Sequence, residues 1–326
     1  MNCVTLISEV NQKFSSQYRG ELANHLPMDL VALERMGASM ERLLSYRDNY
    51  VKRLEPRLNS LGLEVTADNW DQYLGLNKYH ADYLKYFENY LATYGLKQTL
   101  EAHLPELFRG VSGGAFHGLI RLGYALDTDN IEEVSQALGY WAISYLDLGA
   151  RGFAKGQKRP VDIFSDLSEE FLGFRPEAPN IARRMEMIGL LDRFRQICAE
   201  LNSAETSYAS ISQLVLMLFA QTHDFTALHA VTATHAFRLA SSYCFGSESS
   251  ELFVGLAAAY VSIRAPKVTK TEVDQIQMQW EALKERAINS NDDHVPKIVY
   301  TCHEEYLVHG YPSYFATASQ YVEMFA

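Results

Sequence analysis

The sequence predicts an all-α fold, organised as a single large multi-helix domain over residues 1–326. Apolar residues recur at spacings of three, four and seven along most of the chain, which is the period of amphipathic helices. Alternating strand patterns are few, and no βαβ rhythm or internal repeat is visible. Hydrophobic residues make up 48% of the chain and charged residues 21%, so the chain can bury a substantial core.

The first half of the chain predicts three clear helices, over residues 27–54, 79–94 and 131–148. Pro27 suits the first position of a helix, because its missing N–H would have no partner there. The second helix carries a stripe of tyrosines, and we expect Gly95 to end it. Each pattern leaves one apolar face to be buried, which supports a core made of helices.

Residues 151–180 differ from their surroundings, because they are rich in glycine, proline and charge and contain only a short helical piece. This composition predicts a long surface segment, which we expect to act as a loop or lid. Helical patterns then resume. The predicted helices cover residues 181–201, 207–221, 225–243, 251–264, 271–288 and 296–308.

The charge balance excludes several classes of function. The chain has 29 Lys and Arg residues against 40 Asp and Glu, and the net charge of −11 argues against binding to nucleic acid or to an anionic membrane. The longest apolar stretch, near residues 252–261, is too short to span a bilayer. Four widely spaced cysteines and the lack of a secretory pattern favour a cytoplasmic location. Twenty tyrosines suit a site for aromatic ligands, whereas the oligomeric state stays open.

Two short motifs match catalytic patterns only in part. Residues 110–114, GVSGG, fit the G-x-S-x-G pattern of serine hydrolases, which needs a strand before Ser112. No strand is predicted there, so we favour a turn that lets a helix start close to its neighbours. A phosphate-binding turn and a Ser112 nucleophile are the alternatives. In HEEYLVH, His303 and His309 are six residues apart, whereas the zinc-binding pattern needs four, so both are predicted to be surface or supporting residues.

Histidines in apolar segments are the strongest indication of a functional site. A buried histidine usually has its own partner, but carboxylates are scarce in these segments, and one metal ion would satisfy several imidazoles at once. His294 and Lys297 are three residues apart and can share a helix face. His229 and His235 are six apart and cannot point the same way on a regular helix. The histidines in such segments are His25, His117, His223, His229, His235 and His294.

Several segments together resemble the questin oxidase family. They are NHLPMDLVALERMGAS, AFHGLIRLGYAL followed by ALGYWAISY, HAVTATHAFRL and the late HVPK, and they occur in this order over residues 24–300. Each motif is weak alone, whereas four in order are fairly specific. Members of this family act in aromatic polyketide pathways, where they carry out Baeyer–Villiger-type oxygen insertion or ring cleavage.

The resemblance implies a helical oxygenase without flavin, and the lack of a dinucleotide-binding motif agrees with this. It also implies a mononuclear non-haem iron site, Fe²⁺, that is rich in histidine. The imidazole ligands that it implies are His25, His117, His229 and His235. His294 is the reserve ligand, should His235 face away.

The resemblance further implies that Lys297, carboxylated by CO₂, is an anionic ligand. Lysine forms a carbamate only as a free amine, so we expect burial and a nearby cation to depress the pKa of Lys297. Arg121 lies four residues after His117, on the same helix face. Either it steadies a phenolate or peroxide intermediate, or it pairs with a buried carboxylate such as Asp127 or Asp224.

The implied reactants are O₂ and a phenolic or quinone-like aromatic substrate, with two electrons from NADPH or from the substrate itself. Tyr79, Tyr83, Tyr124 and Trp141 are candidate aromatic walls, although a core role is favoured for each. Two other functions stay open. One is a helical homologue that binds a ligand without turnover, and the other is a hydrolase that uses Ser112.

Overall fold

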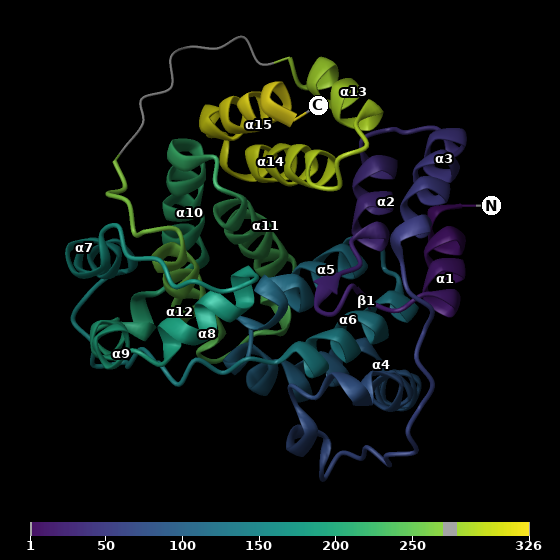
Figure 1. Cartoon of the computed structure of the whole chain (residues 1–326), viewed down its shortest axis with the longest axis horizontal. Coiled ribbons are helices and arrows are strands. Elements are labelled where there is room, and N and C mark those ends of the chain that lie inside the picture. Colours follow the sequence, from purple (N-terminus) through teal and green to yellow (C-terminus); the bar gives the residue numbers. More distant parts are fainter. Residues whose placement is uncertain (1, 270–278, 326) are drawn as a thin grey trace.

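The computed structural model describes residues 2–269 and 279–325, and helices dominate this part of the chain (Figure 1). A short antiparallel hairpin, in which β1, Gln17–Tyr18, pairs with β2, Leu22–Ala23, lies between the first two helices. The predicted all-α class is therefore confirmed. Within the described residues, no helix is long and apolar enough to cross a membrane.

The N-terminal region holds three helices, one of which was not predicted. They are α1, Cys3–Lys13, α2, Leu26–Arg35, and α3, Met40–Tyr50. The prediction of one continuous helix over residues 27–54 is wrong, because the chain breaks between α2 and α3. Gly37 has a φ of +96°, which side chains disfavour, and the Ser39 side chain then caps α3 by accepting a hydrogen bond from the backbone N–H of Arg42.

The next three helices pack in series, with α6 against both α4 and α5. They are α4, His80–Arg109, α5, His117–Asp127, and α6, Ile131–Ser144. Gly95 breaks the helical backbone of α4 with a φ of +77°, as its role as a stop predicts. Helical turns resume directly after it and continue to Arg109, so the break joins two helical pieces of one element.

Residues 151–180 contain a regular helix as well as loops. That helix is α7, Pro160–Phe171, and the segment is followed by α8, Ile181–Gly189, and α9, Asp192–Ala199. Isolated parallel bridges join Phe153 to Asn202 and Lys158 to Leu201, so the segment is tied to the chain beyond α9. The helix predicted over residues 181–201 is two helices, α8 and α9. The function of the segment as a lid stays a prediction.

After α9, the described residues form six more helices, of which the last was not predicted. They are α10, Tyr208–Thr222, α11, Phe225–Ala240, α12, Glu248–Ser262, α13, Trp280–Asn289, α14, Val295–His309, and α15, Pro312–Phe325. Part of the helix predicted over 271–288 lies outside the described residues.

Short 3₁₀ turns join several elements: η1, Val51–Arg53, η2, Trp70–Tyr73, η3, Asn77–Tyr79, η4, Gly113–Phe116, η5, Ser203–Glu205, and η6, Ser241–Tyr243.

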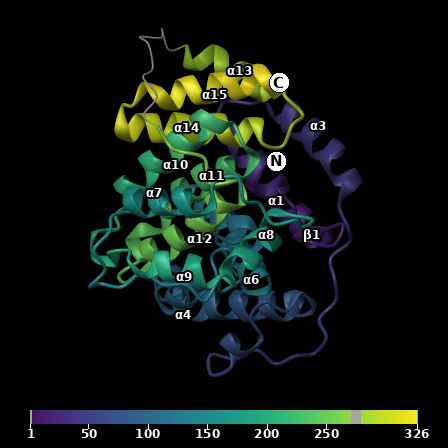
Figure 2. The same cartoon turned by 60° about the vertical axis from the view of Figure 1, so that its left-hand side comes forward.

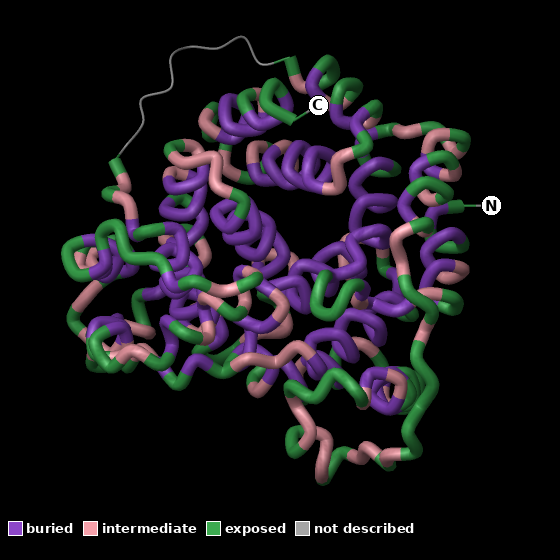
Figure 3. The backbone as a smooth tube through the Cα atoms, viewed as in Figure 1, coloured by how far each residue is buried: buried purple, intermediate pink, exposed green. Residues whose placement is uncertain are grey.

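The centre of the fold is formed by helices that are buried on nearly all sides (Figure 3). One of them, α11, packs against α5, α10, α12 and α14, and Figure 2 shows it between α14 and α12. Its contact with α5 is close: a Cβ atom on Gly123 would lie 2.6 Å from the Cβ of Ala236. Side chains on nearly every face of α11 are therefore buried, and its polar residues need buried partners.

Candidate metal centre

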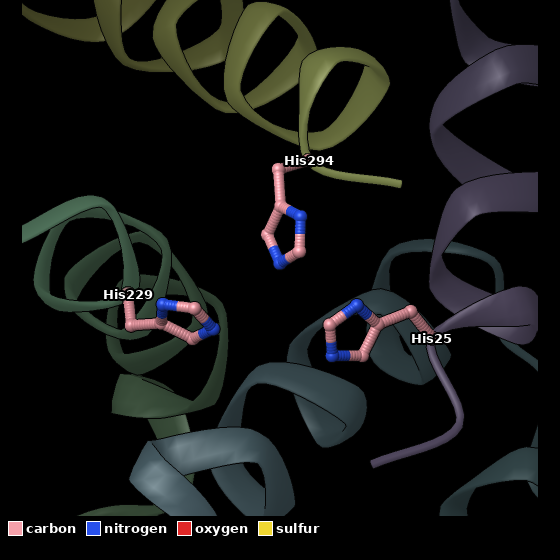
Figure 4. Close-up of side chains that lie close together, drawn as sticks. All are labelled: His25, His229 and His294. Atoms are coloured by element: carbon pink, nitrogen blue, oxygen red, sulfur yellow. The ribbon is translucent and has the colours of Figure 1, made fainter. Parts of the chain in front are cut away.

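Four buried histidines from distant parts of the sequence meet inside the fold, and we call them the histidine cluster: His25, His117, His229 and His294. His25 and His294 directly precede α2 and α14, His117 is the first residue of α5, and His229 lies near the start of α11. Figure 4 shows the rings of three of them around a common space. Each imidazole is thus positioned by the beginning of a different helix.

The four rings are close enough for one small ligand to contact several of them. The ring centroids of His25 and His117 are 4.6 Å apart, and those of His117 and His229 are 4.8 Å apart. The centroid of His294 lies 5.0 Å from that of His25 and 5.5 Å from that of His229. One ring nitrogen from each of His25, His229 and His294 lies within 4.8 Å of the other two.

A repeated local pattern places two of these histidines. The sequences HLP at residues 25–27 and HVP at residues 294–296 each put a proline at the beginning of a helix. Proline is favoured there because it has no N–H to leave unpaired. The side chains of His25 and His294 therefore project from the start of their helices, so both can face the same space from different helices.

A strained turn places His117. All three residues of 114–116 have positive φ angles, which is unfavourable for the alanine and the phenylalanine among them. Gly113 lets this turn pass close to α6, because a Cβ atom there would lie 1.6 Å from the carbonyl oxygen of Ser144. Strain of this kind persists where surrounding structure holds it, and here it sets the position of a buried imidazole.

The GVSGG segment, residues 110–114, leads into this turn, and it is a turn before a helix as the favoured interpretation predicted. It follows the helix α4 and not a strand, so it lacks the context of a nucleophile elbow. Ser112 is buried, and its hydroxyl packs close to Gly255 of α12. The structure therefore offers no support for a hydrolase that uses Ser112.

Hydrogen bonds to the backbone orient two rings of the cluster. The Nδ1 of His229 lies 2.7 Å from the carbonyl oxygen of Phe225, and the Nδ1 of His117 contacts the carbonyl oxygen of Gly114. Because a carbonyl only accepts, each Nδ1 donates and each Nε2 keeps its lone pair. Among the described residues, the Nδ1 of His25 and the Nε2 atoms of His117 and His294 have no hydrogen-bond partner.

Burial favours the neutral form of these rings. It lowers the pKa of His25 to about 3 and holds the pKa values of His117 and His229 well below the usual value. The positive charge of Lys297 and the neighbouring rings add to this effect. Neutral imidazoles are the form that binds metal ions, and the buried nitrogens without partners are atoms that a metal ion would satisfy.

Asp293, which the sequence analysis did not single out, lies beside two rings of the cluster. One of its oxygens lies 3.1 Å from the Nδ1 of His25, and the other lies 3.4 Å from the Nδ1 of His294. Arg53 approaches the same carboxylate to 3.2 Å. Burial alone would raise the pKa of Asp293, but His25 and His294 outweigh it and hold that pKa below its usual range. A carboxylate in this place orients ligand histidines and raises their basicity.

Lys297 lies in the first turn of α14, with only 3% of its surface exposed. Its Nζ is 3.8 Å from an oxygen of Asp29, which is itself fully buried and accepts a hydrogen bond of 3.0 Å from the Tyr46 hydroxyl. Burial lowers the pKa of Lys297 and raises the pKa of Asp29. Burial therefore shifts this pKa in the direction of the free amine that a carbamate requires, whereas the charges of Asp29 and Asp293 oppose the shift.

All four histidines of the cluster line a cavity of about 610 Å³. This volume is typical of a site for a small organic molecule. The hairpin, the end of α6, the start of α8 and the turn before His117 form its walls. Pro179 and Asn180 also line it, so the end of the segment 151–180 borders the cavity.

The structure does not bring His235 into the histidine cluster. Its Nδ1 lies 2.6 Å from the carboxylate of Glu305 instead, further along α11. His294 is the fourth member of the cluster in place of His235, which is the case for which the resemblance implied it as the reserve ligand. His223 ends α10 and contacts the side chain of Gln320.

Arg121 is buried and pairs with a carboxylate, which is the second of its two expected roles. The carboxylate belongs to Glu133 of α6, 2.5 Å from the Nε of Arg121, rather than to Asp127 or Asp224. The expected partners were wrong because Asp127 binds Arg35 at 2.9 Å, whereas Asp224 caps the first turn of α11. Arg121 does not line the cavity.

The candidate aromatic walls do not line the cavity either. Tyr83, Tyr124 and Trp141 belong to the hydrophobic core, and Tyr79 packs against Tyr73. The aromatic side chains that do line the cavity are Tyr18, Tyr145 and Phe225. Helical spacing could not point to this set, because Tyr18 and Tyr145 lie outside helices.

A cavity lined by four buried imidazoles defines a candidate transition-metal site in an all-α protein. The questin oxidase-like family model matches residues 22–302, a range that includes the whole histidine cluster and Lys297. The chain therefore belongs to this family, and membership implies an oxidoreductase of the oxygenase type. No curated protein matches the chain.

Proposed function

We propose that the chain is a non-haem iron oxygenase that acts on a phenolic or quinone-like aromatic substrate. The observation that carries this proposal is the set of buried imidazole nitrogens without partners at the wall of the cavity. A structural role would supply each such nitrogen with an acceptor or a donor. The four residues that would hold the metal are His25, His117, His229 and His294.

Iron is the metal that fits the oxygenase chemistry of the family. Imidazole ligands suit iron, zinc, copper and nickel alike, so the ligand set alone does not choose between them. Iron in this place would supply the binding and reduction of O₂, which a redox-inactive ion such as zinc does not.

The residues of the chain would bind and orient the reactants. Asp293 lies beside His25 and His294, and the backbone carbonyls of Gly114 and Phe225 accept from His117 and His229, so that the other ring nitrogens would be left to bind the metal. The cavity would take the aromatic substrate, with Tyr18 and Phe225 among its apolar surfaces. The buried position of the cluster limits the access of water to the reacting groups.

Lys297 is proposed to carry CO₂ as a carbamate. The support is its burial, its distance of 3.8 Å from Asp29, and the lowering of its pKa by burial, which is the direction that a free amine requires. A carbon NMR spectrum recorded with ¹³C-labelled bicarbonate should show one carbamate resonance that is absent from Lys297→Arg. A spectrum without this resonance in protein loaded with diamagnetic Zn²⁺, which does not broaden the signal as Fe²⁺ would, would remove Lys297 from the ligand set.

The experiment that tests the function measures metal content and O₂ consumption together. Protein purified without an affinity tag or chelator should contain about one iron per chain by plasma mass spectrometry. With phenols or quinones it should consume O₂, and an added requirement for NADPH would identify the electron donor. Protein that stays metal-free after anaerobic Fe²⁺ addition, yet binds aromatic ligands, would instead be a non-catalytic binding homologue.

A further inference from the structure

Three arginines line the cavity, and two of them already have carboxylate partners. Arg53 lies 3.2 Å from Asp293. Arg183 lies 2.5 Å from Glu21 of the hairpin turn and 2.8 Å from Glu186 of its own helix. These ion pairs offset the charge of both side chains, although the Nε of Arg53 is also buried without a hydrogen-bond partner.

Arg184, the third arginine, is different. Among the described residues its guanidinium makes no hydrogen bond or ion pair, and its Nε is buried without a partner. Burial lowers the pKa of Arg184, and the nearby charge of Arg175 lowers it further, against an opposing effect of Asp224. A half-buried guanidinium in this state would gain from an anion that supplies the missing acceptor.

Arg184 and its sequence neighbour Arg183 make different contacts at the cavity. Arg183 binds Glu21, and Asn180 donates a 2.9 Å hydrogen bond to the same carboxylate, so α8 is joined to the hairpin at the border of the cavity. Arg184 takes no part in this junction. It lines the same cavity as the histidine cluster, where the planar fork of a guanidinium matches the two oxygens of a carboxylate.

We propose that Arg184 determines specificity by binding a carboxylate on the aromatic substrate while the reacting ring lies near the histidine cluster. The inference rests on the proposed function for the identity of the ligand as a substrate. The substrate class is therefore an aromatic carboxylate, held at one end by Arg184. Neutral analogues of the same shape should bind less well, because they cannot form a charge-assisted pair.

A matched pair of probes tests this inference on the full chain, both metal-free and iron-loaded. The probes are naphthalene-2-carboxylate and naphthalene-2-carboxamide, which share their shape but differ in charge, and titration calorimetry measures their affinities. We expect the carboxylate to bind about tenfold more tightly than the amide. Arg184→Gln should abolish this preference, and Arg184→Lys should retain part of it. The control Arg183→Gln should keep the preference.

Equal affinities for the two probes, no binding of either at millimolar concentration, or a preference that survives Arg184→Gln would each overturn the inference. The metal-free protein matters here, because a carboxylate could otherwise bind the metal directly. Metal content and O₂ consumption of the same samples distinguish the two proposals. If the chain takes up no iron after anaerobic Fe²⁺ addition but still prefers the carboxylate, the oxygenase is overturned and the carboxylate site at Arg184 stands. Bound iron with O₂ consumption but no preference would overturn the carboxylate site and leave the oxygenase.

Discussion

Two buried polar clusters lie along the same pair of helices, α11 and α14, and they treat their histidines differently. The histidine cluster is near the beginning of both helices. Further along lies what we call the glutamate cluster: Glu305 with His235, Arg238, Tyr208 and His309. Here each histidine has a partner, since His235 binds Glu305 at 2.6 Å and His309 binds the Tyr208 hydroxyl at 2.8 Å.

The difference shows that burial alone does not identify a candidate ligand. His229 and His235 are equally buried and lie on one helix, but among the described residues only His235 faces a carboxylate. The donor and acceptor groups around the glutamate cluster are matched to one another, which is typical of a structural network. The histidine cluster keeps nitrogens without partners, and this is the property that a metal ion would use.

The largest expected effect comes from removing one histidine of each cluster. His229→Ala should reduce bound metal from about one equivalent to less than a tenth, because a ligand is lost. His235→Ala should keep the metal and lose stability instead, since it leaves the buried Glu305 with one partner fewer. Plasma mass spectrometry and urea unfolding measure the two effects. Metal loss from His235→Ala, or full retention by His229→Ala, would remove the distinction between the clusters.

The centre of the glutamate cluster should be the next most sensitive position. Glu305→Ala leaves the buried His235 and Arg238 without their shared acceptor, so we expect a loss of about 3 kcal/mol in the free energy of unfolding. The neighbouring Glu304 is half-buried and contacts His303, so Glu304→Ala should cost less than about 1 kcal/mol. Both variants should retain full metal content. A smaller loss for Glu305→Ala than for Glu304→Ala would contradict a structural role for this cluster.

A buried histidine outside both clusters shows what burial does without a carboxylate partner. His80 contacts the Ser16 hydroxyl at 2.9 Å, and burial, helped by Arg121 and Arg57, lowers its pKa to about 3. The unfolded chain protonates this ring below pH 6.5, whereas the folded chain does not. Its contribution to stability is therefore complete above pH 6.5 and is lost as the pH falls, by about 2 kcal/mol between pH 6.5 and 5.

His80→Gln should remove this share of the acid sensitivity. Urea unfolding at pH 7, 6 and 5 would show a shallower decline for the variant than for the unchanged chain. His103→Gln tests the same effect at a second position, because burial also lowers the pKa of His103 and its ring contacts a tyrosine hydroxyl. Parallel declines for His80→Gln and the unchanged chain would mean that His80 is protonated in the folded state.

Much of the fold followed from the sequence, because apolar periodicity reports which helix faces are buried. The breaks inside predicted helices were missed at Gly37 and near residue 190, since apolar spacing continues across a short turn. Gly95 was recognised because glycine is a common end of helices, but spacing does not reveal that a second helical piece follows at once.

The candidate site was predictable only where local spacing determines direction. Six residues on a helix separate His229 from His235 by roughly 240°, so the sequence indicated that they could not both face one point. Which of them meets His25 and His117 depends on how α11 packs against α5 and α14, and no local pattern contains that information. Asp293 was missed for a related reason, because it lies in the turn before α14 and has no helical phase.

The smallest expected effect comes from removing the charge of Asp293, which tests whether the histidine cluster also needs a carboxylate partner. Asp293→Asn keeps the shape of the side chain but removes its charge, so we expect about a tenfold weaker affinity for Fe²⁺ at unchanged stoichiometry. Asp127→Asn is the control, because that carboxylate binds Arg35 outside the cavity and should leave the affinity unchanged. Competition against a chelator of known affinity measures both variants. An unchanged affinity in Asp293→Asn would show that His25 and His294 are held in place without this charge, and the two clusters would then differ completely in their dependence on a carboxylate.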